Sequence, residues 1–126
     1  LNPAHAIANS NLGLVLSQMN RDAEAVEHYD RAIAADPQYI DALVNRGVAL
    51  NKLKRYDEAI ASQRRALELR PEHAGALSNL GMALANLNRH AEAIACYEEA
   101  RRIEPQSPAA QHNLGNALLL TGEFAR

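Results

Sequence analysis

The amino-acid sequence predicts an all-α protein built as a solenoid of stacked helical hairpins. Two observations support this fold class. Alanine and leucine are abundant while aromatic residues make up only 4% of the chain, and such a mixture favours helix over strand. Several residue types also recur every 34 residues along the 126-residue chain. A fixed period of this length is typical of proteins whose repeated units stack on one another.

The repeat is clearest in four columns of identical residues, one each of proline, glycine, asparagine and leucine. The columns are Pro3, Pro37, Pro71 and Pro105; Gly13, Gly47, Gly81 and Gly115; Asn11, Asn45, Asn79 and Asn113; and Leu16, Leu50, Leu84 and Leu118. We therefore interpret residues 1–126 as a single array. Its units are expected at about 4–37, 38–71 and 72–105, followed by a truncated fourth unit at 106–126.

Each unit contains two predicted helices. The first helices are expected at about 4–18, 39–53, 73–87 and 107–121, and the second helices at about 22–35, 56–69 and 90–103. Asn20, Asn88 and Gly122 stand between the two helices, where a left-handed residue would end the first one. Lys54 fills that position in the second unit and suits it less well. The repeated proline closes each second helix, because proline disfavours helical geometry in the residue before it.

Small residues predict where the two helices of a unit meet. A glycine inside a helix costs about 1 kcal/mol relative to alanine, so the glycine column is expected to permit close approach of the second helix. The matching small residues there are Ala25, Ala59 and Ala93. Larger apolar residues should fill the core around this contact: Leu12, Leu16, Val26, Tyr29 and Ile33; Leu43, Leu50, Ile60 and Leu67; and Leu77, Leu80, Leu84, Ile94, Tyr97 and Ile103.

These units resemble the tetratricopeptide repeat, whose pattern is a Leu-Gly pair, an alanine, an aromatic residue, a second alanine and a closing proline. The first and third units match it with Leu12-Gly13, Ala25, Tyr29, Ala32 and Pro37, and with Leu80-Gly81, Ala93, Tyr97, Ala100 and Pro105. The resemblance implies a right-handed α-solenoid whose first helices line a concave groove. The second unit departs from the pattern at Arg46 and Gln63, and we expect looser packing there.

The groove implied by this resemblance is the expected site of ligand contact. An asparagine amide offers two donors and an acceptor, so the asparagine column could pair with the backbone of an extended peptide. The expected peptide-binding residues are Asn11, Asn45, Asn79, Asn113, Ser10, Ser78, Asn51, Lys52, Asn86 and Asn116. The alternative is that the asparagines form hydrogen bonds to adjacent helices and hold their register.

Two further resemblances suggest different partners. The asparagine column, and the segment from Asn113 to Phe124, are similar to the repeats of bacterial O-linked N-acetylglucosamine transferases, which implies a substrate-recruiting segment of a larger glycosyltransferase. Asn45 also matches the central asparagine of the carboxylate clamp in co-chaperone repeats. The flanking clamp positions are Ser10, Leu14, Gly75 and Asn79. None is basic, so a terminal carboxylate would lack a strong charge-assisted partner.

The composition favours a protein or peptide partner over catalysis. The formal charge of -2, from 13 basic and 15 acidic residues, argues against a nucleic-acid ligand, which needs a clustered basic face. No stretch approaches the roughly 20 apolar residues that span a bilayer. Cys96 is the single cysteine of the sequence, and no catalytic, cofactor or metal motif is recognised. The five histidines are expected to be solvated: His5, His28, His73, His90 and His112.

The ends of the sequence suggest an excised piece of a longer protein. The chain begins with Leu1, so its sequence does not determine the targeting signals of the parent protein. The cytoplasm is the favoured compartment. A catalytic domain elsewhere in the parent protein is compatible with the sequence. The fourth unit ends at the start of its second helix, which would leave Leu114, Leu118 and Leu120 uncovered. Exposed apolar surface tends to find a partner. We therefore expect end-to-end packing or dimerisation through the C-terminal end, and a self-association module is the alternative function.

Overall fold

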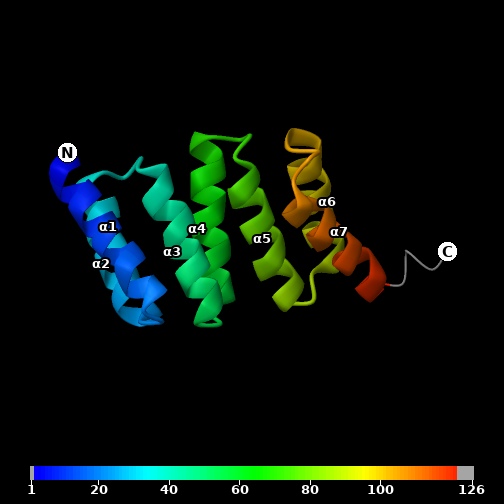
Figure 1. Cartoon of the computed structure of the whole chain (residues 1–126), viewed down its shortest axis with the longest axis horizontal. Helices are drawn as coiled ribbons and strands as arrows, with labels where there is room; N and C mark the ends of the chain where they lie inside the picture. The colour runs from blue at the N-terminus through cyan, green and yellow to red at the C-terminus, as the bar shows by residue number, and fades with distance from the viewer. Residues whose placement is uncertain (1, 122–126) are drawn as a thin grey trace.

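The computed structural model describes residues 2–121, and these residues form helices joined by short turns. The helices are α1 (Pro3–Gln18), α2 (Asp22–Ala35), α3 (Ile40–Lys52), α4 (Tyr56–Leu69), α5 (Ala74–Asn86), α6 (His90–Ile103) and α7 (Pro108–Thr121). They stand side by side in one row from the N-terminal to the C-terminal end (Figure 1). The predicted all-α helical-repeat solenoid is confirmed, and every predicted helix end agrees with the structure to within one residue. The division of the chain into units stays a prediction.

The first helices lie on the inner side of the row. Helix α1 contacts α3, α3 contacts α5 and α5 contacts α7, whereas α2, α4 and α6 make no contact with one another in the described part of the chain. Because the first helices approach each other more closely than the second helices do, the array curves towards them. Their exposed sides therefore form a common inner surface.

The turns inside the hairpins share one backbone conformation. Asn20, Lys54 and Asn88 have φ angles of 61°, 62° and 61°, which place all three in the left-handed region. The next residue then donates its N–H to a carbonyl in the last turn of the first helix, as Arg21 does to Leu16 at 2.9 Å. This is the usual hydrogen-bonded ending of a helix at a left-handed residue. Lys54 adopts the conformation although it has a Cβ atom, and Gly122, the fourth expected turn residue, lies outside the described residues.

The glycines at positions 13 and 81 allow the two helices of their hairpins to pack closely. A Cβ atom added to Gly13 would lie 2.7 Å from Tyr29 Cε1, and one added to Gly81 would lie 2.5 Å from Tyr97 Cε1. The aromatic ring of each second helix therefore rests directly on the backbone of the first helix. Such contact requires that the first helix have no side chain at this position.

The second unit achieves the same contact with a polar residue. The side chain of Gln63 lies over Gly47, is 0% exposed and donates from Nε2 to the Val44 carbonyl at 3.0 Å. The expectation of looser packing in this unit is therefore wrong. This contact still costs stability, because Gln63 Oε1 is buried without a hydrogen-bond partner among the described residues.

Most of the predicted core is buried, while Ile33, Leu67 and Ile103 are half-buried. Leu12 was expected in the core but is 45% exposed, whereas Leu80 and Leu114, at the same position of later units, are 6% and 4% exposed. Those two leucines pack in the main core cluster, but α1 has no second helix before it in the described residues. Leu114, expected to be uncovered, is thus buried, while Leu120 is 72% exposed.

The glycine contact predicts opposite effects for the same substitution in two units. Gly81→Ala should lower the free energy of unfolding by about 1 kcal/mol, because overpacking a core costs about 1–3 kcal/mol and the better helix propensity of alanine offsets only about 1 kcal/mol. Gly115→Ala is the matched control, since its added Cβ meets no described atom within 4 Å. It should raise stability instead. Urea unfolding followed by circular dichroism measures both, and equal effects would contradict the close contact.

The left-handed turn at Lys54 predicts a stabilising substitution. Lys54→Gly should raise the free energy of unfolding by roughly 0.5–1 kcal/mol, because glycine reaches positive φ without the steric penalty that a Cβ atom brings. Lys54→Ala removes the same charge but keeps the Cβ atom, so it should give no comparable gain. Thermal unfolding of the two variants separates the backbone effect from the charge effect. Equal melting temperatures for Lys54→Gly and Lys54→Ala would exclude a backbone effect.

Candidate functional site

The four recurring asparagines lie on the inner surface formed by the first helices. Asn11 is exposed, whereas Asn45, Asn79 and Asn113 are half-buried. None of these four amides forms a side-chain hydrogen bond within residues 2–121. The asparagine hydrogen bonds seen on the first helices involve other positions, such as Asn9 and Asn86. The interpretation that this column holds the helices in register therefore has no hydrogen bond to support it.

Asn45 lies in a hollow between α1 and α3. The hollow has a volume of about 160 Å³, and Lys52 provides its only formal charge. Its lining is otherwise neutral and partly apolar: Leu14, Ser17, Gln18, Tyr29, Asn45, Val48 and Lys52. Burial raises the pKa of Tyr29 to about 12, and the nearby Asp22 carboxylate adds a smaller effect in the same direction. The phenol at this hollow is therefore neutral at physiological pH.

Asn79 and Asn113 lie in a second hollow, between α5 and α7. Its volume is about 320 Å³, and its lining also includes Ser78. The other lining residues are mostly small: Ala74, Gly75, Met82, Ala100, Glu104, Ser107, Ala109 and Ala110. The structure thus brings Ser78, Asn79 and Asn113 together, while Asn45 and Lys52 belong to the first hollow and Asn11 lines neither.

The remaining predicted groove residues have different environments. Asn86 donates to Asn51 Oδ1 at 3.4 Å and to the Met82 carbonyl at 3.0 Å, and Asn116 lies 3.0 Å from His112 Nε2. These amides are already engaged within the array. Each amide still has a group without a hydrogen bond among the described residues, namely the oxygen of Asn86 and of Asn116 and the N–H groups of Asn51.

Ser10 departs from its expected place on the open groove, since it is only 4% exposed. The same position on α3 is Val44, which packs in a core cluster with Ala66 of α4 and Ala76 of α5. In the first two units this position lies where helices meet, whereas Ser78 in the third unit is half-buried and lines the second hollow.

The charges of the inner surface do not form a carboxylate clamp. Of the flanking clamp positions, Leu14 lines the first hollow, Gly75 and Asn79 line the second, and Ser10 is covered. Lys52 and Glu104 are the charged residues that line the two hollows. A ligand in either hollow would therefore meet amides and apolar groups rather than paired cations.

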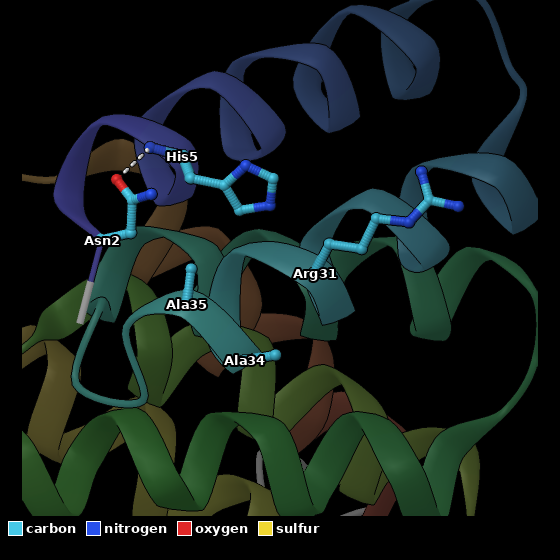
Figure 2. Close-up of a pocket in the computed structure, with 5 residues that line it drawn as sticks. All are labelled: Asn2, His5, Arg31, Ala34 and Ala35. Atoms are coloured by element: carbon cyan, nitrogen blue, oxygen red, sulfur yellow. Dashed lines mark hydrogen bonds between the residues drawn. The ribbon is translucent and has the colours of Figure 1, made fainter.

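A larger hollow lies at the N-terminal end, away from the asparagine column. It measures about 430 Å³ and is lined by Asn2, His5, Arg31, Ala34 and Ala35. Figure 2 shows the His5 ring pointing towards Arg31, and the His5 backbone N–H donating to Asn2 Oδ1 at 3.2 Å. None of the predicted groove residues lines this hollow. It places an imidazole and a guanidinium beside a helix start but is open to solvent, with both His5 and Arg31 exposed.

Two histidines have structural environments that the sequence analysis missed. His73 Nδ1 accepts the N–H of Ala76 at 2.9 Å and so caps α5. His90 Nδ1 is buried without a described hydrogen-bond partner. The expectation that all five histidines are solvated is therefore wrong. The place of His73 just before a helix was the available signal, because capping side chains act from that position.

Residues 2–121 contain neither a cluster of metal-ligating side chains nor a membrane-spanning helix. No group of three or more histidine, cysteine, aspartate or glutamate side chains could hold a metal ion there. No helix in the same part of the chain is both long and apolar enough to cross a membrane.

Solved structures of other proteins share this architecture. The first tetratricopeptide domain of Spaghetti (RPAP3), bound to the HSP90 peptide SRMEEVD, matches with a TM-score of 0.93 at 24% identity and covers 97% of each chain. The second tetratricopeptide domain of human RPAP3, in complex with the HSP70 peptide SGPTIEEVD, matches with a TM-score of 0.87 at 27% identity, over 90% of this chain and 95% of that one. The Arabidopsis OM64 tetratricopeptide domain matches with a TM-score of 0.89 at 22% identity, over 93% and 97%.

The family models agree with these structures. No curated protein matches the sequence at a significant level. Models described as tetratricopeptide repeats match residues 38–106 and 108–126, and one described as a TPR repeat matches residues 13–54. The match over residues 38–106 alone includes more than half of the 126 residues. This chain therefore belongs to the tetratricopeptide-repeat family.

Proposed function

We propose that this chain is a protein-interaction module that binds an extended peptide segment along the inner surface of its first helices. The observation that supports the proposal is the set of asparagine amides that recur on this surface without hydrogen-bond partners among the described residues. An amide can donate to a peptide carbonyl and accept from a peptide N–H. Such pairing fixes an extended backbone without depending on the identity of its side chains.

The hollows indicate which side chains such a peptide would present. Leu14 and Val48 line the first hollow and Met82 the second, so each offers apolar contact beside its asparagine. Alternate side chains of an extended peptide point to the same side, and in recognition of this kind pockets for them supply specificity. We infer that the preferred ligand has small or medium apolar side chains at the two hollows.

The ligand is proposed to be an internal segment rather than a free C-terminus. The HSP90 and HSP70 peptides bound by the two RPAP3 domains both end in the acidic sequence EEVD. An acidic C-terminus gains most from charge-assisted hydrogen bonds to cations. Lys52 is the only basic residue that lines either hollow here, so an EEVD-type ligand is disfavoured for this chain.

The proposed function of the chain itself does not include a catalytic step. Its match to a family of binding repeats supports this proposal, together with a groove that would hold a peptide by amides. The fate of a bound peptide would then depend on other parts of a longer parent protein. The similarity to the repeats of O-linked N-acetylglucosamine transferases stays a prediction, and a parent sequence containing a glycosyltransferase domain would support it.

The amides predict the effect of removing them. A peptide selected by display against the whole chain should bind the Asn45→Ala, Asn79→Ala double variant about 10-fold or more weakly, since each lost hydrogen bond costs about 0.5–1.5 kcal/mol. Calorimetry measures the affinity, and circular dichroism checks that helicity is unchanged. Asn88→Gly is the matched control, because it removes an amide from an exposed turn whose φ of 61° suits glycine. Unchanged affinity in the double variant would refute the groove proposal.

The same peptide also tests the preference for an internal segment. Amidating its C-terminus removes the terminal charge, and affinity should change less than about 2-fold if the groove pairs with the backbone. A large loss on amidation would instead support carboxylate recognition. That result would contradict the proposed ligand class while leaving peptide binding itself intact.

A further inference from the structure

The hollow between α1 and α3 contains a buried phenol whose hydroxyl has no partner. Tyr29 lines this hollow and is only 1% exposed, because its ring lies on the backbone at Gly13. Its hydroxyl forms no hydrogen bond within residues 2–121. The unpartnered polar atoms that are sealed from solvent there are Gln63 Oε1 and His90 Nδ1, and the Tyr29 hydroxyl is not one of them. The hydroxyl is therefore the part of this side chain that a molecule in the hollow can reach.

This hydroxyl acts as a hydrogen-bond donor at physiological pH. Burial raises the pKa of Tyr29 to about 12, with a smaller contribution from the Asp22 carboxylate, so the phenol keeps its proton. Water can accept that proton while the hollow is open. A ligand that seals the hollow removes the water, and a buried donor left without a partner carries the full cost of its desolvation. A ligand that fills this hollow well must therefore supply an acceptor.

Ser17 presents the complementary group in the same hollow. Its hydroxyl has one proton and two lone pairs, and it donates the proton to Asp22 Oδ1 at 2.8 Å. Ser17 lines the hollow and is 8% exposed, so it offers only acceptor capacity to a ligand. A ligand hydroxyl matches both groups, because it accepts from Tyr29 and donates to Ser17. A carboxylate can only accept, and it would also lie near the like charge of Asp22.

The remaining lining favours a small side chain with an apolar part. Leu14 and Val48 provide apolar contacts beside the two hydroxyls. The volume of about 160 Å³ corresponds to roughly five waters at about 30 Å³ each. Among the natural side chains, threonine combines a hydroxyl and a methyl group on one small branched carbon. Serine lacks the methyl group, and valine, which has the shape of threonine, lacks the hydroxyl.

We propose that this first hollow is a threonine-selective subsite. The hydroxyl of a peptide threonine accepts from Tyr29 and donates to Ser17, while its methyl group contacts Leu14 and Val48. The inference rests on the proposed peptide binding, and it narrows the small or medium side chain expected at the first hollow to one that carries a hydroxyl. Asn45, which lines the same hollow, stays available for the peptide backbone.

The other units lack this arrangement among the described residues. Gln63 occupies the position of Tyr29 in the second unit, where it is 0% exposed and donates from Nε2 to the Val44 carbonyl. Tyr97 occupies the same position in the third unit but does not line the second hollow. The selectivity is therefore confined to the first hollow, and a bound peptide should have one fixed threonine position.

Peptide selection from a random display library tests the subsite, with the whole chain and its Tyr29→Phe variant as separate baits. The variant keeps the ring on Gly13 and removes only the hydroxyl. The wild type should enrich threonine at one fixed position, whereas Tyr29→Phe should enrich valine there. Tyr97→Phe is the matched control, because it removes a hydroxyl at the same repeat position and should still select threonine. Circular dichroism verifies that each variant is folded.

Calorimetry with the peptide selected by the wild type then measures the coupling. Replacing its fixed threonine by valine should weaken binding to the wild type about 10-fold, and binding to Tyr29→Phe by less than about 3-fold. An equal loss on both proteins would overturn the subsite, and so would a wild-type selection without a threonine position.

The Asn45→Ala, Asn79→Ala double variant distinguishes failure of the subsite from failure of the proposed function. If the selected peptide binds this variant more weakly but shows no coupling between its threonine and Tyr29, the groove function stands and the threonine subsite is refuted. If the peptide binds the double variant as tightly as the wild type, the groove proposal is refuted, and the subsite with it.

Discussion

The contact between a glycine on each first helix and a large side chain on its partner is the constraint on which the rest of the structure depends. It sets how closely the two helices of a hairpin approach, because the ring of Tyr29 or Tyr97 rests on backbone rather than on another side chain. That spacing determines how each hairpin presents its first helix to the next unit. The inner surface, and the hollows that contain the asparagines, follow from the same repeated geometry.

The sequence predicted the helices accurately because each helix end has a local cause. A proline or a left-handed residue acts on the adjacent backbone regardless of what packs around it. Burial is different, since it depends on which element covers a side chain. Leu12 and Ser10 were misplaced for this reason: one lacks the covering helix that its repeat partners have, and the other lies between helices. Gln63 was misjudged because its side chain covers Gly47 as a ring does in the other units, and its Nε2 donates a hydrogen bond to Val44.

The candidate site could be predicted in outline but not in shape. The 34-residue period placed an asparagine at the same position of every first helix, and the resemblance to tetratricopeptide repeats placed that position on the inner surface. Whether neighbouring asparagines share a hollow depends on the size of the side chains across from them, as with Gly75 and Ala109 beside Asn79 and Asn113. The hollow at Asn45 is smaller and is bounded by Val48, Lys52 and the Tyr29 ring. The groove therefore has unequal compartments, although the asparagine column that runs along it is regular.

The neighbour-to-neighbour packing of the row also determines how the chain folds. Helices contact only the elements next to them or one unit away, so the segments that must meet are close in sequence and the loops closed between them are short. Low contact order of this kind favours fast folding. Any hairpin can then act as a nucleus from which order spreads to its neighbours. In the α3–α4 hairpin, the buried Gln63 oxygen has no hydrogen-bond partner among the described residues, so we expect this hairpin to be a weaker nucleus than the tyrosine-containing hairpins on either side.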